Sequence, residues 1–215
     1  MKIMAINGSP NASGYTAKLI DVLLDQCRNL GAECEKINLE DYEIDGCRNC
    51  NCCSNVGECI REDDFIHLKA NIYEADGIII GSPYYDGGAT DLLRTLFIRF
   101  SKSGSKEKIL DGKYILGLSL SGSCNGRQLA EYCANFGEQK SKSRLKISSI
   151  ISLKISQTND IIEITNDTNL KKLVKKTSKN FIKDIKRKRS KLYLKVRRFI
   201  CKFTDKLCFV SLFFR

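Results

Sequence analysis

The feature that most constrains the fold is the start of the chain, where an apolar run passes into a loop of small polar residues and then into a helical pattern. Residues 2–7 are apolar enough for a buried strand, and the segment from Gly8 to Thr16 follows. Residues 16–30 then carry leucine and isoleucine at helical spacing up to Gly31. A strand, a turn and a helix in this order predict the first unit of an α/β sheet.

The rest of the chain repeats this alternation. We expect strands at 33–39, 75–81, 114–120 and 145–155, and helices at 63–73, 90–100 and 126–136. Three consecutive isoleucines centre the strand at 75–81, which is typical of a strand buried on both faces of a parallel sheet. Because right-handed crossovers place helices on both faces, we predict an α/β fold with a doubly wound five-stranded parallel sheet of order 2-1-3-4-5.

Charge divides the chain near residue 170. Residues 171–215 hold 17 of the 36 lysines and arginines and only two acidic residues, so residues 1–170 keep 19 basic against 23 acidic residues, a net charge of −4. We therefore predict one domain at 1–170 and a basic amphipathic C-terminal helical tail at 171–215. The tail is expected to begin with the closing helix of the sheet. Contact with an anionic membrane surface is an alternative role, and nucleic acid is the least favoured partner.

The N-terminal apolar run is too short for a signal peptide, and no stretch approaches the roughly 20 apolar residues of a membrane-spanning helix. We expect a cytoplasmic protein, with the basic tail as the part that would bring it to the periphery of a membrane. Five of the eleven cysteines lie between residues 47 and 59. In an intracellular protein this crowding favours metal or redox use over disulfides.

The loop from Gly8 to Thr16 is suited to a phosphate group, because its backbone N–H groups and hydroxyls surround a small volume at the positive end of a helix dipole. It has neither the Gly-Lys-Ser/Thr ending of nucleoside triphosphate loops nor a Gly-x-Gly-x-x-Gly fingerprint. The alternative is that these residues form an ordinary strand-to-helix turn rich in helix-capping residues. The loops at 82–88 and 119–126 would meet it at the switch point of the sheet, so one ligand could contact all three.

Together these loops resemble those of the NAD(P)H-dependent flavin mononucleotide (FMN) reductase and flavodoxin-like superfamily, over roughly residues 1–155. The resemblance implies a flavodoxin-like fold that binds FMN. It assigns the phosphate to Ser9, Asn11, Ser13, Gly14, Tyr15 and Thr16, and the isoalloxazine ring to Pro83, Tyr84, Tyr85, Asp86 and Gly87. Ser119, Ser121 and Gly122 complete the expected cofactor-binding set. Tyr15 replaces an asparagine that is common in the family, so we expect only its backbone to bind.

The strongest short motif is Cys47-x2-Cys50-x2-Cys53-x5-Cys59, with Cys52 as an additional thiol inside it. Such compact spacing allows one loop to wrap a small iron–sulfur cluster. The motif resembles that of the iron–sulfur flavoproteins, a branch of the same superfamily, and implies a [4Fe–4S] cluster held by these four cysteines. A tetrathiolate zinc site and a set of cysteines without metal remain open alternatives.

No hydrolytic triad or paired-carboxylate motif is present, and the single histidine, His67, is expected to have a surface or packing role. We assign no catalytic residue, because the chemistry would belong to the cofactors. We expect an FMN-dependent oxidoreductase linked to NAD(P)H or ferredoxin, with a small-molecule or protein electron donor and acceptor, and a homo-oligomer. A non-enzymatic electron carrier and a membrane-docked interaction protein are the alternatives.

Overall fold

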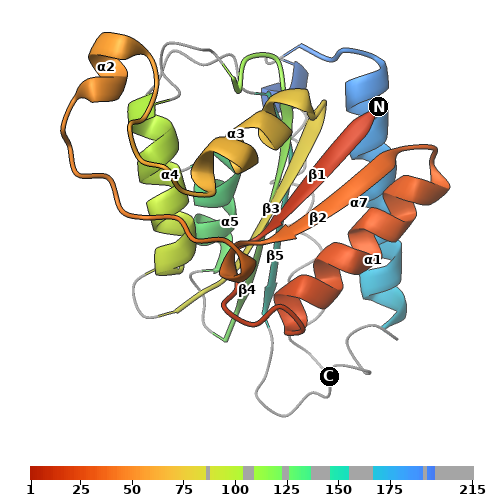
Figure 1. The fold of residues 1–215 in the computed structure, drawn as a ribbon. Helices are drawn as coiled ribbons and strands as arrows, with labels where there is room; N and C mark the ends of the chain where they lie inside the picture. Colours follow the sequence, from red (N-terminus) through yellow and green to blue (C-terminus); the bar gives the residue numbers. More distant parts are fainter. Residues whose placement is uncertain are drawn as a thin grey trace.

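The computed structural model describes residues 1–85, 88–103, 109–122, 126–136, 146–154, 167–190 and 193–196. Five parallel strands form one sheet in the order β2-β1-β3-β4-β5, with helices on both faces (Figure 1). The predicted flavodoxin-like doubly wound sheet is confirmed. The strands are β1 (Lys2–Asn7), β2 (Glu33–Asn38), β3 (Gly77–Pro83), β4 (Tyr114–Ser121) and β5 (Lys146–Lys154).

The helices include the five long ones that cover the sheet and two short ones that the sequence patterns did not predict. The long helices are α1 (Tyr15–Asn29), α3 (Phe65–Glu74), α4 (Asp91–Ser103), α5 (Gly126–Ala134) and α7 (Thr168–Lys186). The short ones are the 3-10 turn η1 (Leu39–Asp41) and α2 (Cys52–Val56). Both short helices lie between β2 and α3, in the segment that contains the cysteine motif. A helix of one turn leaves no hydrophobic period in the sequence, which is why the patterns missed them.

Successive residues of β1 point into two different hydrophobic cores. Met4 and Ile6 pack on the side of α3, α4 and α5, whereas Ile3 and Ala5 pack on the side of α1 and α7. This alternation follows from the two-residue period of a strand and explains why the strand is apolar throughout.

The carboxyl ends of β1 and β3 are brought together by a glycine. The backbone N–H of Gly8 donates to the carbonyl oxygen of Gly81 at 2.8 Å. A Cβ atom on Gly8 would lie 3.1 Å from that oxygen and 3.2 Å from Cβ of Leu93. Glycine therefore allows the loop after β1 to lie directly against the end of β3 and the start of α4.

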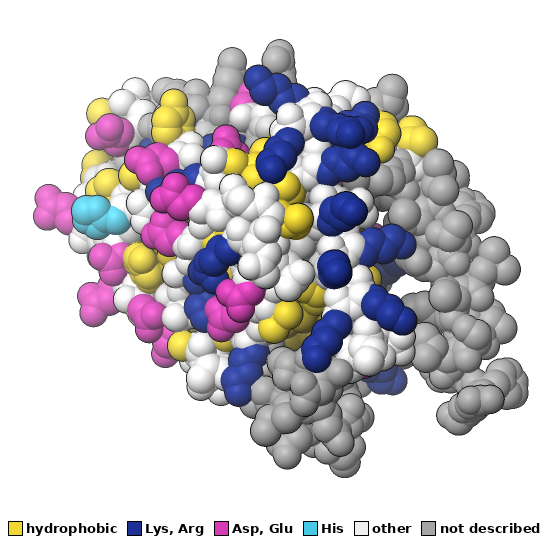
Figure 2. All heavy atoms as spheres, turned by 90° about the vertical axis from the view of Figure 1, so that its right-hand side faces the viewer, with side chains coloured by type: hydrophobic (Ala, Val, Ile, Leu, Met, Phe, Trp, Pro, Cys, Tyr) yellow, Lys and Arg dark blue, Asp and Glu magenta, His cyan; other side chains and the backbone are white. Residues whose placement is uncertain are grey.

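Helix α7 crosses residue 170, where the sequence suggests that the basic tail begins. Its inner face, including Val174, Phe181 and Ile182, is buried in the core shared with α1. Figure 2 shows lysines along its outer face, where the exposed ones are Lys171, Lys172, Lys175, Lys176, Lys179, Lys183 and Lys186. The boundary at residue 170 stays a prediction, and the apolar end of the tail lies outside the described residues. Among the helices in the described ranges, none has the length and apolar content to cross a membrane.

Candidate functional site

A hollow of about 880 Å³ opens at the carboxyl edge of the sheet, and we call it the sheet-edge hollow. Its volume lies within the range of roughly 300–1,000 Å³ that is common for small-molecule sites. Its lining comes from the loops after β1, β3 and β4, from η1 and from the start of α4. The lining residues are Pro10, Glu40, Tyr84, Tyr85, Ala89, Thr90, Asp91, Leu92, Arg94 and Gly122. A doubly wound sheet is expected to bind its ligand at this switch point.

The loop between β1 and α1 is braced by its own side chains. Asn7 Oδ1 accepts from Ser9 N at 3.2 Å, Ser9 Oγ accepts from Asn11 N at 3.1 Å, and Asn11 Oδ1 accepts from Ser13 N at 3.0 Å. The helix that follows has Gly14 as its N-cap residue, which has no side chain to cap it. The positive end of the α1 dipole is therefore suited to an anion.

The residues predicted to bind phosphate differ in exposure. Ser9 and Thr16 are 4% and 2% exposed, Gly14 and Tyr15 are partly buried, and Asn11 and Ser13 are exposed. From this loop Pro10 lines the sheet-edge hollow. The loop and the hollow are therefore adjacent, and the assignment of individual phosphate ligands stays a prediction.

The loop after β3 brings two tyrosines to the sheet-edge hollow. Tyr84 N donates to the carbonyl oxygen of Leu120 at 2.7 Å, which ties the loop to the end of β4. Tyr85 and Gly88 exchange backbone hydrogen bonds of 3.1 and 2.8 Å in a tight turn. The predicted ring contacts Asp86 and Gly87 lie outside the described residues. Pro83 is the last residue of β3.

The loop after β4 contributes one lining residue to the hollow. Gly122 lines it, and Ser121 is buried just before it. Ser119 is fully buried, and its hydroxyl donates to the carbonyl oxygen of Gly126. Ser119 therefore fixes the start of α5 in this structure.

Several lining residues were missed by the sequence patterns. Thr90 Oγ1 donates to the carbonyl oxygen of Gly8 at 2.5 Å, which joins the loop after β1 to the start of α4. Arg94 is 44% exposed, stands 3.7 Å from the carboxylate of Asp91, and supplies a positive charge to the hollow. Glu40 enters from η1. Their place in the chain was the only available sign of this role. Each of them comes after the carboxyl end of a strand, which is the edge of a parallel sheet where ligands bind.

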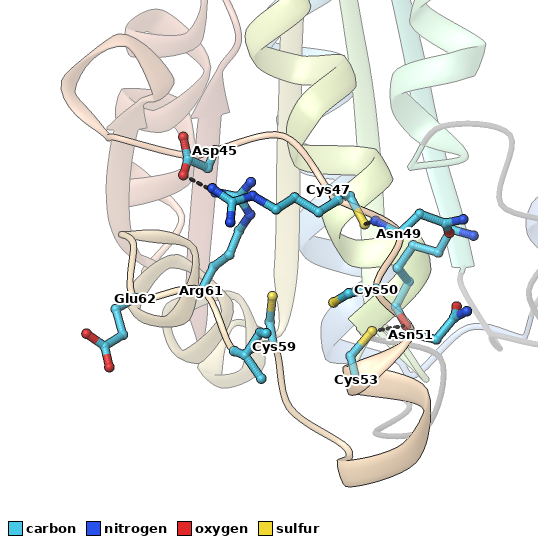
Figure 3. Close-up of a pocket in the computed structure, with 12 residues that line it drawn as sticks. Asp45, Cys47, Asn49, Cys50, Asn51, Cys53, Cys59, Arg61 and Glu62 are labelled. Atoms are coloured by element: carbon cyan, nitrogen blue, oxygen red, sulfur yellow. Dashed lines mark hydrogen bonds and ion pairs between the residues drawn. The ribbon is translucent and has the colours of Figure 1, made fainter.

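A second hollow, of about 410 Å³, lies beside the other end of α4, and we call it the cysteine hollow (Figure 3). Its lining residues are Asp45, Cys47, Arg48, Asn49, Cys50, Asn51, Cys53, Cys59, Ile60, Arg61, Glu62 and Lys102. The structure thus brings all four predicted cluster ligands to one space. Figure 3 shows their sulfur atoms around that space.

The backbone of the loop turns sharply between the first three cysteines. Asn49 and Asn51 have positive φ angles of 55° and 60°, which asparagine tolerates better than most residues. Cys53 Sγ then contacts the carbonyl oxygen of Lys102 at 3.4 Å, at the end of α4. These turns place Cys47, Cys50 and Cys53 on one wall of the hollow.

The two ends of the cysteine loop are joined to each other. Asp64 N donates to the carbonyl oxygen of Glu43 at 3.2 Å, and Glu43 N donates to the carboxylate of Asp64 at 2.8 Å. Asp45 N donates to the carboxylate of Asp63 at 3.1 Å. We call these paired segments, 43–45 and 59–64, the stem of the loop.

The donor set of the cysteine hollow fits an iron–sulfur cluster. Four thiols line one space, and the backbone N–H of Asn49 already points to Cys47 Sγ at 3.4 Å. Within the described part of the chain, no three or more histidine, cysteine, aspartate or glutamate side chains form a group that could hold a metal ion. In a cubane cluster each thiolate binds a different iron, so its ligands stand around a cluster and not around one ion.

The pKa of Cys50 in the loop and the pKa values of two buried cysteines outside it are shifted in opposite directions. The backbone N–H and then the thiol of Cys52 donate to Cys50 and lower the pKa of the Cys50 thiol, which favours the thiolate that binds metals. Burial raises the pKa of Cys27 to about 12 and also raises the pKa of Cys133. Cys27 and Cys133 therefore behave as buried apolar side chains.

The sheet order, the helix N-terminus after β1 and the hollow at the switch point define a flavodoxin-like protein. The model of the family described as NADPH-dependent FMN reductase matches residues 1–135. The chain belongs to this NADPH-dependent FMN reductase family, which confirms the resemblance seen in the sequence.

Curated relatives of the chain include iron–sulfur flavoproteins. One from Archaeoglobus fulgidus is 37% identical over 134 residues, which cover 62% of this chain and 65% of the relative. Another from Methanocaldococcus jannaschii is 40% identical over 99 residues, covering 46% and 51%. The chain thus spans between half and two thirds of the length of these relatives. A flavone reductase has the same fold, with a TM-score of 0.63 and 22% identity, covering 86% of this chain and 63% of that one.

Proposed function

We propose that this protein is an FMN-dependent oxidoreductase that binds FMN in the sheet-edge hollow and a [4Fe–4S] cluster in the cysteine hollow. The observation that carries the proposal is the convergence of the loops after β1, β3 and β4 on one hollow, in a chain of the FMN reductase family. The curated iron–sulfur flavoproteins at 37% and 40% identity support the second cofactor.

The phosphate of FMN would bind at the N-terminus of α1. There the amides of Ser9, Asn11 and Ser13 would exchange their internal bonds for phosphate oxygens, with Gly14, Tyr15 and Thr16 adding first-turn amides and a hydroxyl. The exchange replaces neutral acceptors with charged ones, which form stronger hydrogen bonds.

The isoalloxazine ring would lie against the loop that contains Pro83, Tyr84, Tyr85, Asp86 and Gly87. Tyr84 and Tyr85 both line the sheet-edge hollow, and their rings offer flat apolar surface to an aromatic ligand. Ser119, Ser121 and Gly122 would shape the wall formed by the loop after β4.

Arg94 would bind an anionic group of the nicotinamide cofactor, because it supplies positive charge to the wall of the same hollow. When bound, FMN would transfer electrons from NAD(P)H or a ferredoxin to a small acceptor. The cluster would transfer single electrons to or from the flavin. Cys47, Cys50, Cys53 and Cys59 would hold the cluster.

The test is the cofactor content of protein purified without oxygen. We expect flavin, with iron and acid-labile sulfide at about four per flavin, the stoichiometry of a four-thiolate cubane. Flavin without iron would reject the cluster and leave the flavin site standing. The absence of both would reject the proposal.

Stopped-flow reduction distinguishes an enzyme from an electron carrier that uses the same hollow. Rapid loss of flavin absorbance on mixing with NADPH or NADH is the outcome expected of a reductase. Reduction by dithionite or ferredoxin alone would instead identify a carrier or a ferredoxin-fed enzyme.

A further inference from the structure

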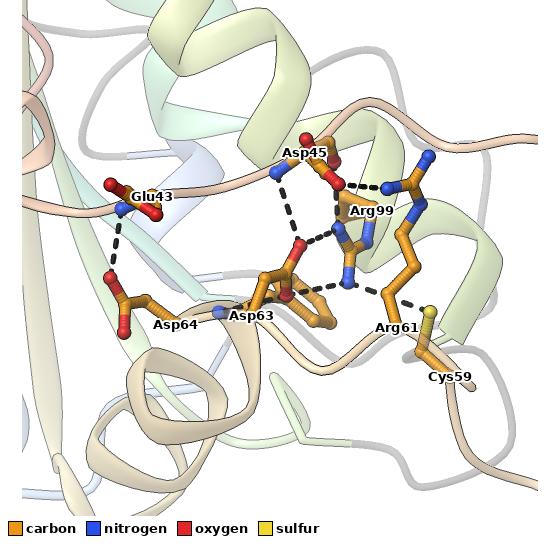
Figure 4. A network of polar contacts seen from close by, with 8 residues as sticks. Glu43, Asp45, Cys59, Arg61, Asp63, Asp64 and Arg99 are labelled. Atoms are coloured by element: carbon orange, nitrogen blue, oxygen red, sulfur yellow. Dashed lines mark hydrogen bonds and ion pairs between the residues drawn. The ribbon is translucent and has the colours of Figure 1, made fainter.

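Arg99 is a positive charge buried where α4 meets the stem of the cysteine loop (Figure 4). Its side chain is 1% exposed, in the middle of a helix whose inner face is otherwise apolar. Burial of a guanidinium is costly unless its donors are well paired. The partners of Arg99 therefore indicate what it does.

The guanidinium donates hydrogen bonds to both segments of the stem and to the thiol of Cys59. Nη1 donates to Asp63 Oδ2 at 2.5 Å and to the carbonyl oxygen of Asp45 at 2.7 Å. Nη2 donates to Asp63 Oδ1 at 3.0 Å and to Cys59 Sγ at 3.5 Å. The ring of Phe65 lies under the group, with its centroid 4.5 Å from Cζ. One planar fork thus fixes the distance between Cys59 and the body of the protein.

Asp63 is held in its ionised form in this network. Burial opposes the charge, but the hydrogen bond from Arg99 and those from the backbone of Asp45 and Phe65 outweigh it, so the pKa of Asp63 is lowered. The ion pair therefore persists at neutral pH, and it keeps the guanidinium oriented toward the thiol.

Cys59 lies apart from the other three cysteines in the chain, and its Sγ contacts Arg99 Nη2 at 3.5 Å. Cys47, Cys50 and Cys53 lie within one short stretch, and Cys53 Sγ contacts the carbonyl oxygen of Lys102. Cys59 follows α2 and Gly57, whose φ of 99° marks a sharp turn. The stem sets its position relative to the other thiols, and Arg99 holds the stem.

We propose that Arg99 positions Cys59 as a cluster ligand and raises the reduction potential of the cluster through its hydrogen bond to Sγ. This inference rests on the cluster of the proposed function. A reduced cluster carries more negative charge, so hydrogen bonds to its sulfurs stabilise the reduced state. A lysine keeps the charge but lacks the planar fork that contacts Asp63, Asp45 and Cys59 at once.

Arg61 provides a matched control for Arg99. It lines the same hollow and carries the same charge, but it forms an ion pair with the carboxylate of Asp45. Arg99→Lys and Arg61→Lys therefore make the same chemical change. Only Arg99→Lys removes a contact with the Cys59 thiol.

The experiment compares wild type, Arg99→Lys and Arg61→Lys as full chains loaded with FMN and reconstituted with iron and sulfide without oxygen. For Arg99→Lys we expect iron loss to a chelator to be about tenfold faster, since loss of a supporting contact costs about 10–100-fold in metal affinity. We also expect a lower midpoint potential in an EPR-monitored titration. In cluster-free protein, hydrogen exchange at 59–63 should be faster. Arg61→Lys should keep the iron retention and the midpoint potential of the wild type.

The outcomes separate this inference from the proposed function. Wild-type iron retention and potential in Arg99→Lys would overturn the inference alone, and so would an equal change in Arg61→Lys. Failure of the wild type to take up iron would overturn the cluster as well. If Arg99→Lys loses FMN and folds poorly, Asp63→Asn decides, because it weakens the orientation of Arg99 and leaves the guanidinium in place. Unchanged iron retention in Asp63→Asn would then reject the inference.

Discussion

The sheet-edge hollow and the cysteine hollow lie at opposite ends of α4 and are built by different means. Asp91 and Arg94 from the first turns of α4 line one, and Lys102 from its last turn lines the other. The first hollow is formed by strand ends whose positions are set by backbone hydrogen bonds of the sheet. The second is formed by one irregular loop that side chains attach to α4. The first is therefore shaped by the fold, and the second by a small number of individual contacts.

The burial of the two regions agrees with this difference. Every residue of β3 up to Ser82 is buried, whereas α2 has no buried residue, and Val56 and Ile60 are 77% and 65% exposed. A loop with so little core of its own is stabilised mainly by its stem and by what it binds.

Removal of the Asp63 carboxylate should have the largest effect on stability. Asp63→Ala leaves the buried Arg99 without its ion-pair partner, and such changes cost about 3–5 kcal/mol in the free energy of unfolding. Urea denaturation measures the loss. The control is Asp25→Ala, which breaks an exposed pair with Arg28 and should cost under about 1 kcal/mol. Equal effects of the two changes would show that the stem does not depend on the network.

A methyl group at Gly8 should damage the sheet-edge hollow and spare the cysteine hollow. It would lie 3.1 Å from the oxygen of Gly81, and overpacking of this kind costs about 1–3 kcal/mol. We expect FMN binding to weaken about tenfold, equivalent to about 1.4 kcal/mol, with the iron content unchanged. Fluorescence titration of FMN and iron analysis provide the measurements. The control is Gly46→Ala, where no atom lies within 4 Å of the added carbon. Loss of iron in Gly8→Ala would contradict the independence of the two hollows.

Arg94→Ala should have a smaller effect, on the nicotinamide cofactor. A half-exposed charge contributes roughly 1 kcal/mol, so we expect KM for NADPH or NADH to rise about fivefold with FMN retained. Steady-state kinetics with Arg28→Ala, a half-exposed arginine at the end of α1, as the control would test it. An unchanged KM would exclude Arg94 from cofactor binding.

The pH dependence of the stem should be the smallest effect near neutrality. The pKa of Asp63 is lowered in the folded protein, so its carboxylate is ionised in both folded and unfolded chains between pH 7 and about 5. Its contribution to stability is fully present above the unfolded value of about 3.9 and is lost as the pH falls through the folded value. Protection of the amides at 59–63 against hydrogen exchange, relative to the intrinsic rate at each pH, checks this between pH 7 and pH 3. Loss of protection already at pH 6 would contradict it.

The same contrast explains what could be predicted from the sequence. Hydrophobic periods identify strands and helices, and parallel topology then dictates that the loops at Gly8, Ser82 and Ser119 meet, so the place of the sheet-edge hollow was predictable. The exact lining was not, because the directions of Glu40 and Arg94 depend on tertiary packing. Arg99 was missed because an arginine among helical apolar residues suggests an exposed side chain, and its acceptors lie 36 or more residues earlier in the chain.

Because the ends of the cysteine loop are joined, the loop can gain or lose residues during evolution without disturbing the rest of the domain. Residues 46–58 leave and re-enter the body at nearly the same point, because the hydrogen bonds between Glu43 and Asp64 and between Asp45 and Asp63 close the segment. Insertion or loss of residues in a segment with adjacent ends adds little strain to the rest of a domain. The cysteine hollow is in this sense a module, which the parallel sheet can gain, exchange or lose while the sheet-edge hollow is retained.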